Sequence, residues 1–109
     1  MPYDAQIEER IQTIIADWEN TAHKKMFGGV CHLLNGNMFY GVYKAYLILR
    51  LGAEKGRQAL KQPHVRPFDI TGRPMKGWVM VATDGFKTDA ELADWLGQAR
   101  TFADSLPPK

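Results

Sequence analysis

The pair Asn35-Gly36, which lies between two apolar segments, constrains the fold of this chain more than any other feature. Asn-Gly readily adopts the positive φ angles of a two-residue turn, so the pair predicts an antiparallel β-hairpin. The turn also sets the register, because pairing Leu34 with Asn37 fixes every later pair. The expected partners are Leu33 with Met38, His32 with Phe39, Cys31 with Tyr40, Val30 with Gly41, Gly29 with Val42 and Gly28 with Tyr43.

Apolar periodicity predicts helices towards both ends of the chain. The first is expected over about residues 4–22, with Asp4 as its N-cap. The last begins at the capping box Thr88-Asp89-Ala90-Glu91 and ends before Pro107-Pro108. A short helix is expected at residues 53–61, because Pro63 prevents its continuation.

Further strands are expected over residues 45–51 and 78–82, with a short extended piece at residues 68–71. In the strand at 45–51, Leu47, Leu49 and Leu51 should share one face. These elements predict an α+β fold in which N- and C-terminal helices pack on an antiparallel sheet of four to five strands. The expected order is α-β-β-β-α-β-(β)-α.

The Gly28-Gly29 pair beside Lys24 and Lys25 has two interpretations. A phosphate-binding glycine loop needs a helix that starts directly after it, and here a strand is expected to follow. Relief of crowding against Val42 and Tyr43 on the next strand, or a bulge, therefore explains the glycines better.

Length and composition favour one globular domain over residues 1–109. Apolar runs such as that at residues 46–49 are far too short to span a membrane, and the N-terminus does not resemble a secretory signal. A cytoplasmic location is therefore the expectation. The single cysteine, Cys31, has no partner for an internal disulfide, which agrees with a reducing compartment.

Charge is distributed unevenly along the chain. Residues 1–22 carry one basic and five acidic side chains, residues 23–77 carry ten and two, and residues 78–109 carry three and five. The basic middle segment either matches the acidic ends within the fold or contacts an anionic partner.

No constellation in the sequence predicts catalysis, a metal site or a cofactor. Cys31 and His32 are adjacent in a strand and point to opposite faces, so they cannot form a thiol-imidazole pair. His23, His32 and His64 lack the spacing of zinc ligands. Paired carboxylates are also not expected to meet in a cleft, because the acidic residues lie mostly on helix surfaces.

Cations in two segments are the candidate contacts for a partner or an anion. Prolines and glycines between residues 66 and 78 hold Arg66, Arg73 and Lys76, and Lys24 and Lys25 precede the glycine pair. The competing interpretation is that Asp69 pairs with an arginine and fixes a long connection to the sheet.

The segments Met26-Phe27-Gly28-Gly29-Val30, 35–39, 46–50 and 72–78, together with the closing helix, resemble the TfoX N-terminal domain family in order and over nearly the whole chain. The resemblance implies an α+β domain and carries the residues Met26, Phe27, Gly28, Gly29, Asn35 and Gly36 as its structural motif. TfoX-type regulators of bacterial competence genes add a C-terminal helical domain and are thought to act through protein contacts. This chain is expected to be a short, stand-alone version.

These observations lead to a first hypothesis: a non-enzymatic regulatory or adaptor domain that binds another protein and is linked to transcriptional regulation. Nonspecific nucleic-acid binding through the basic segment is the alternative, and its affinity should fall steeply with salt. A third hypothesis is a small-molecule pocket or an enzyme whose cavity is lined by aromatic side chains, although their spacing favours the core. Dimerisation through an open sheet edge is a further expectation. The aromatic residues concerned are Trp18, Phe39, Tyr43, Trp78, Trp95 and Phe102.

Overall fold

The computed structural model describes residues 4–26, 29–68 and 76–107 of the chain. Three α-helices, one 3-10 helix and six strands lie within these ranges. Their order is α1 (Ala5–Ile14), β1 (Thr21–Met26), β2 (Gly29–Leu34), β3 (Asn37–Tyr43), β4 (Tyr46–Arg50), α2 (Ala53–Ala59), β5 (Val65–Pro67), β6 (Trp78–Val81), η1 (Thr83–Gly85) and α3 (Asp89–Asp104).

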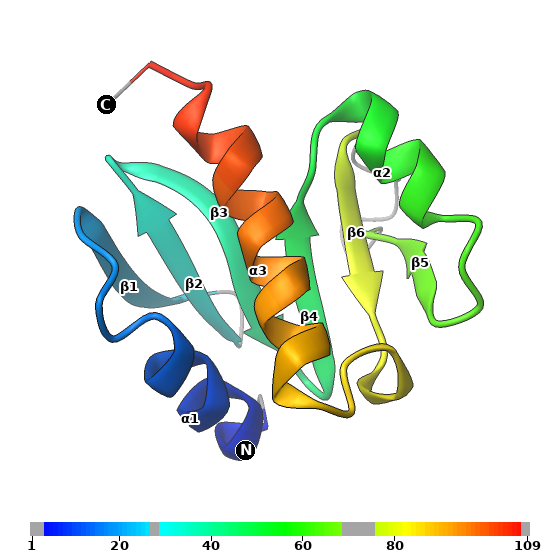
Figure 1. Ribbon diagram of the computed structural model, residues 1–109, viewed down its shortest axis with the longest axis horizontal. Helices are drawn as coiled ribbons and strands as arrows, with labels where there is room; N and C mark the ends of the chain where they lie inside the picture. Colours follow the sequence, from blue (N-terminus) through cyan, green and yellow to red (C-terminus); the bar gives the residue numbers. More distant parts are fainter. Residues whose placement is uncertain (1–3, 27–28, 69–75, 108–109) are drawn as a thin grey trace.

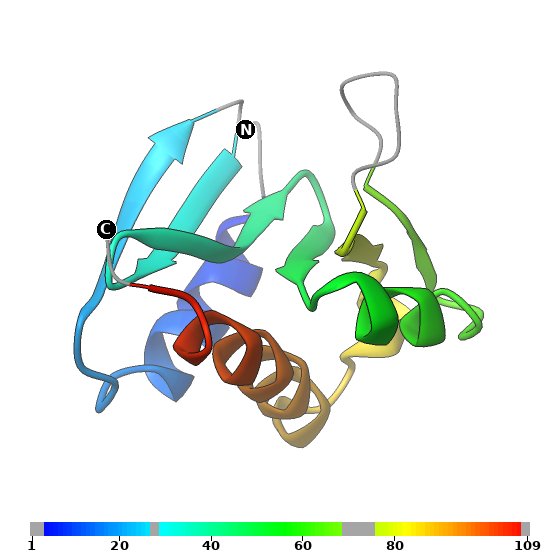
Figure 2. The same cartoon turned by 90° about the horizontal axis from the view of Figure 1, so that it is seen from above.

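The six strands form one antiparallel sheet in the order β1-β2-β3-β4-β6-β5. The three α-helices lie on the same side of this sheet, with α3 across its middle (Figures 1 and 2). No helix of the described residues covers the opposite side (Figure 2). The predicted α+β class with N- and C-terminal helices is confirmed, and the sheet has one strand more than the upper limit expected.

The additional strand is β1, whose first two residues, Thr21 and Ala22, lie in the range expected for the end of the first helix. Helix α1 stops at Ile14, and Asn20 adopts a left-handed conformation with φ of 63°, which a continuing helix cannot accommodate. All six residues of β1 then pair with β2, from Thr21 with Leu34 to Met26 with Gly29. This pairing outweighs the helix propensity of the Ala and Lys residues in the segment.

The Asn35-Gly36 turn forms as predicted, because both residues have positive φ angles of 52° and 85°. The predicted register holds only for the first two pairs, Leu34 with Asn37 and Leu33 with Met38. A bulge then shifts it by one residue, so that His32 pairs with Tyr40 instead of Phe39. Phe39 and Tyr40 are both fully buried against the helices, and burial of two adjacent aromatic side chains explains why the extra residue is accommodated.

The bulge changes every later pair of this hairpin. Gly29 faces Tyr43 rather than Val42, and Gly41 faces Cys31 rather than Val30. At these glycines the two backbones come very close: a Cβ on Gly41 would lie 2.5 Å from the carbonyl oxygen of Val30, and one on Gly29 would overlap that of Val42. Gly29 is therefore required, because a Cβ at this position would collide with the neighbouring main chain. Phe27 and Gly28 of the motif lie outside the described residues.

The second half of the chain follows the sequence expectations closely. Helix α2 occupies most of the predicted short helix, and β6 most of the predicted strand at residues 78–82. A strand forms at residues 65–67. Of the extended piece expected at residues 68–71, only Phe68 lies within the described residues, and it directly follows this strand. The predicted capping box is present, since the Thr88 side chain accepts from the Glu91 N–H and the Glu91 side chain accepts from the Thr88 N–H.

The main core lies between the sheet and the helices. Leu47, Leu49 and Leu51 share the face that looks towards the helices, as predicted, and are almost fully buried. Helix α3 adds Leu92, Trp95, Leu96, Ala99 and Ala103, and α1 adds Ile7 and Ile11.

Candidate interaction surface

The face of the sheet that carries no helix is the first candidate for a functional surface, and we call it the open face. Side chains alternate along each strand, so the register assigns every second residue to it. Its residues include Lys24 of β1, Cys31 of β2, Gly41 and Tyr43 of β3, Tyr46 and Ile48 of β4, Arg66 of β5, and Trp78 and Met80 of β6.

The centre of the open face is an apolar cluster with an aromatic border. Ile48, Met80 and Phe68 are almost fully buried within it, although they lie on the side away from the helices. The partly buried rings of Tyr43, Tyr46 and Trp78 pack around them. Aromatic rings that are partly exposed supply large contact areas at low entropic cost, which suits a binding surface.

The strands of the sheet contain no acidic residue in their described ranges, and the sequence has no Asp or Glu between Glu19 and Glu54. Lys24 and Arg66, both exposed, lie on the two edge strands β1 and β5. Five strand spacings of about 4.8 Å separate these edges by roughly 24 Å. The open face therefore has an apolar centre between two cationic edges.

Cations also lie directly beside the aromatic rings. The Lys44 amine is 5.4 Å from the centroid of the Tyr43 ring, and the Arg50 guanidinium is 5.6 Å from that of Trp78. Arg66 donates a hydrogen bond of 3.1 Å to the Tyr46 hydroxyl. These contacts hold positive charge at the border of the apolar cluster.

The cations that the sequence suggested as contacts for a partner or an anion lie apart in the structure. Lys24 and Lys25 are neighbours on β1, so only Lys24 belongs to the open face. Arg66 lies at the opposite edge, and Lys76 borders a cavity next to α2. Arg73 lies outside the described residues, and so does Asp69, the acidic residue of the competing ion pair with an arginine.

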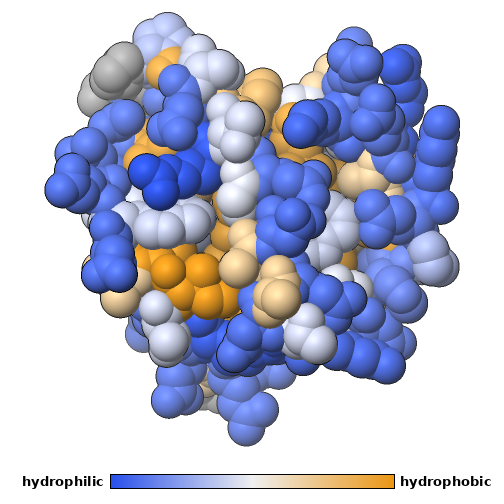
Figure 3. Space-filling model, viewed as in Figure 1, coloured by the Kyte–Doolittle hydropathy of each residue, from blue (hydrophilic) through white to orange (hydrophobic). Residues whose placement is uncertain are grey.

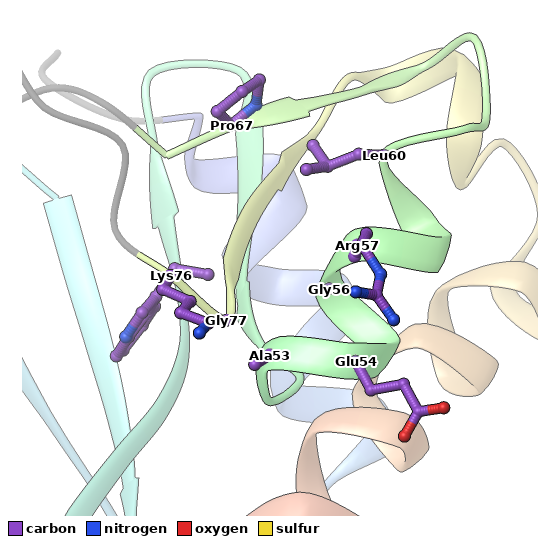
Figure 4. A pocket seen from close by; sticks show the side chains of 9 residues that line it. Ala53, Glu54, Gly56, Arg57, Leu60, Pro67, Lys76 and Gly77 are labelled. Carbon is purple, nitrogen blue, oxygen red and sulfur yellow. The ribbon is translucent and has the colours of Figure 1, made fainter.

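A cavity of about 590 Å³ lies between α2 and the strands β5 and β6 (Figure 4). Sequence reasoning did not identify it, because its lining comes from three separate segments. The residues that line it are Ala53, Glu54, Gly56, Arg57, Leu60, Pro67, Lys76, Gly77 and Trp78. The only signal in the sequence is that Arg57 and Leu60 lie three residues apart within the helix expected over residues 53–61.

The side of the molecule that carries the helices is largely hydrophilic, with apolar patches on both sides of α3 (Figure 3). The groove between α2 and α3 is lined in part by Leu51, Gly52 and Phe102. Acidic and basic side chains are mixed on this side, as in the ion pair of 3.0 Å between Arg10 of α1 and Asp89 of α3. Positive charge therefore predominates less on the side that carries the helices than on the open face.

A buried polar group lies under α1. The His32 imidazole is 1% exposed, and its Nε2 lies 2.8 Å from a carboxylate oxygen of Glu8. Burial alone would raise the pKa of Glu8, but the hydrogen bonds with His32 and Gln12 and the histidine charges outweigh it and lower that pKa. The Tyr40 ring stacks on His32 with centroids 4.6 Å apart, and its buried hydroxyl has no hydrogen-bond partner among the described residues.

The described residues do not form a catalytic pair around the cysteine. Cys31 is buried on the open face and His32 on the helix side, as their adjacency predicted. Burial raises the pKa of the Cys31 thiol, which disfavours the reactive thiolate. Within residues 4–26, 29–68 and 76–107, no group of three or more His, Cys, Asp or Glu side chains is placed to hold a metal ion.

The aromatic residues considered for one cavity are divided between several places. Phe39 and Trp95 are in the main core, with Trp18 packed against it, whereas Tyr43 and Trp78 border the open face. Of the helices in the described ranges, none has the length and apolar character needed to cross a membrane.

Comparison with known proteins agrees with the fold. No curated protein sequence matches the chain significantly. The family model of the TfoX N-terminal domain matches residues 13–103 of the 109. This match begins within α1, includes the whole sheet and ends at the last turn of α3. The chain therefore belongs to the TfoX N-terminal domain family, which is of a regulatory type.

Proposed function

We propose that this protein is a non-enzymatic regulatory domain that binds an acidic partner protein across its open face. The observation that carries the proposal is a sheet face without helices, whose strands contain no described acidic residue and whose two edges carry Lys24 and Arg66. A partner with apolar and acidic side chains would complement both the aromatic cluster and the cationic edges. Membership of a regulatory family supports this function and its link to transcriptional control.

Charge reversal on the open face tests this function. In the variant K24E/R66E, both substitutions lie at exposed positions, so the fold should persist. The matched control is K55E/K87E, which changes the net charge equally at exposed positions of α2 and the segment before α3. Affinity capture from a nuclease-treated bacterial lysate should retain the same partner with the wild type and the control, and lose it with K24E/R66E. Equal retention by all three proteins would contradict the proposal.

Single-stranded nucleic acid is the second candidate partner. The observation that favours it is the pairing of aromatic rings with cations, as at Tyr43 with Lys44 and Trp78 with Arg50, because bases stack on rings while cations contact phosphates. Fluorescence anisotropy with a labelled oligothymidylate of about 20 nucleotides would show affinity falling at least about tenfold between 50 and 200 mM salt. Absence of binding at low salt would exclude this candidate and leave the protein partner.

Dimerisation stays a prediction of the sheet topology. The edge strands β1 and β5 have one unpaired side each, and Lys24 and Lys25 place charge on β1 that opposes pairing with a second copy. The short strand β5 carries Arg66 and Pro67, which oppose pairing there in the same way. Light scattering of the purified protein measures this directly.

A further inference from the structure

The geometry points to a binding site for a small organic anion in the cavity between α2 and β6. The ligand would be an acid with an aromatic or branched apolar body, held by its acidic group at Arg57 and Lys76. The cavity of about 590 Å³ lies within the range of small-molecule sites. The cavity shares Trp78 with the open face, but its cations, Arg57 of α2 and Lys76, are not among the residues of that face.

The floor of the cavity is main chain rather than side chain. Gly56 packs on Gly77, so that a Cβ on Gly56 would lie 3.3 Å from the Gly77 Cα. Gly77 in turn packs on Gly52, and these two glycines have φ angles of 88° and 89°, which other residues rarely adopt. The glycines bring α2 against the start of β6 and leave the space above them without side chains.

The walls of the cavity are apolar. Leu60 is 39% exposed, more than any other large apolar side chain of the described residues. In Figure 4 it points from the end of α2 towards the cavity, and Pro67 of β5 lies opposite. Trp78 adds an aromatic surface. A ligand that covers Leu60 removes apolar surface from water, which favours binding.

The charged residues at the rim are arranged for an anion. Arg57 comes from α2 and Lys76 from the segment before β6, so they border the cavity from two elements (Figure 4). Neither forms an ion pair with a carboxylate of the described residues. The nearby Glu54 side chain points away from Lys76 and Pro67 (Figure 4). Two cations therefore border the cavity, and its lining contains one carboxylate, that of Glu54.

Two fluorescent dyes that differ in charge test the site. The anionic probe is 8-anilinonaphthalene-1-sulfonate, and the matched neutral probe is N-phenyl-1-naphthylamine, which has the same ring system without the sulfonate. The wild type should bind both and prefer the anion. R57Q/K76Q should weaken binding of the sulfonate at least about tenfold and leave the neutral probe unchanged, because only the acidic group meets the cations. L60S should weaken both probes.

The control variant is K55Q, which removes a cation from the same helix outside the cavity and should change neither affinity. Amide chemical shifts provide a second measurement, since binding at this site should perturb Gly56 and Gly77 more than residues of β1. No binding by the wild type, or equal sulfonate affinity of the wild type and R57Q/K76Q, would overturn the inference. Because Lys24 and Arg66 are unchanged in these variants, failure here would leave the proposed function untouched.

Discussion

The same substitution, Gly to Ala, should have opposite effects on stability at Gly41 and Gly97. Gly41 lies in β3, where a Cβ would be 2.5 Å from the Val30 carbonyl oxygen and 3.3 Å from the Cys31 Cα. Gly97 lies inside α3, where a Cβ would meet no atom within 4 Å. The comparison isolates tertiary crowding from intrinsic conformational preference, because the added atom is one methyl carbon in both variants.

The magnitudes follow from these contacts. Ordinary Cβ contacts begin near 3.4 Å, so G41A must displace main chain of two hydrogen-bonded strands by about 0.9 Å. Overpacking of this kind costs about 1–3 kcal/mol of unfolding free energy. G97A should instead raise that free energy by about 0.5–1 kcal/mol, because Ala is the better helix former and the site is open.

Urea unfolding followed by far-UV circular dichroism measures both variants. With an m value of about 1.5 kcal/mol/M, each 1 kcal/mol moves the midpoint by about 0.7 M, so the two shifts are resolvable and opposite in direction. The m value should stay constant. A G41A midpoint within about 0.2 M of the wild type would refute the close approach of β2 and β3, and a lower midpoint for G97A would refute the open environment in α3.

Three further predictions concern the cap of α3 and the polar group under α1. T88A should lower the unfolding free energy by about 1 kcal/mol, as measured by urea midpoint, whereas T88S, which keeps the capping hydroxyl, should not. Because the folded-state pKa of Glu8 is below its usual value of 4.5, its contribution to stability is present above that pH and is lost as the pH falls through the lowered pKa. E8Q should therefore be less stable than the wild type at pH 7 with a difference that shrinks below about pH 4, and a constant difference from pH 7 to pH 3 would contradict the contact with His32. Y40F should be neutral or stabilising by up to about 1 kcal/mol, because it removes a buried hydroxyl without a partner and keeps the ring stacked on His32; a loss of more than 1 kcal/mol in thermal or urea unfolding would show that the hydroxyl is bonded.

The elements that sequence reasoning located correctly are those with a strong local signal. Asn35-Gly36 tolerates the positive φ angles of the turn, and Thr88 and Glu91 satisfy the first N–H groups of α3 reciprocally. Both signals act over a few residues and need no other part of the chain. The end of α1 had no such signal, because Thr21–Met26 becomes a strand only when β2 is present to pair with it.

The candidate site was predictable only in its residue types. The sequence indicated that the middle of the chain is basic; in the structure Arg66 lies on the edge strand β5 and Lys76 lines the cavity beside α2. It did not indicate that Lys24 and Arg66 lie at opposite edges of one sheet face. It also did not indicate that Arg57 of α2 would join Lys76 at one cavity, because that depends on the glycine contacts between α2 and β6.

The sequence by itself determined the class of fold, the hairpin turn, the capped C-terminal helix and the lack of acidic residues between Glu19 and Glu54. Each of these depends on local backbone preference or on composition. The tertiary structure alone decided the bulge at Phe39, the formation of β1 over residues 21–26 and the position of the helices on one side of the sheet. Those outcomes depend on which apolar side chains can be buried together. Such burial requires contacts between segments that are far apart in the sequence, so local sequence patterns do not reveal it.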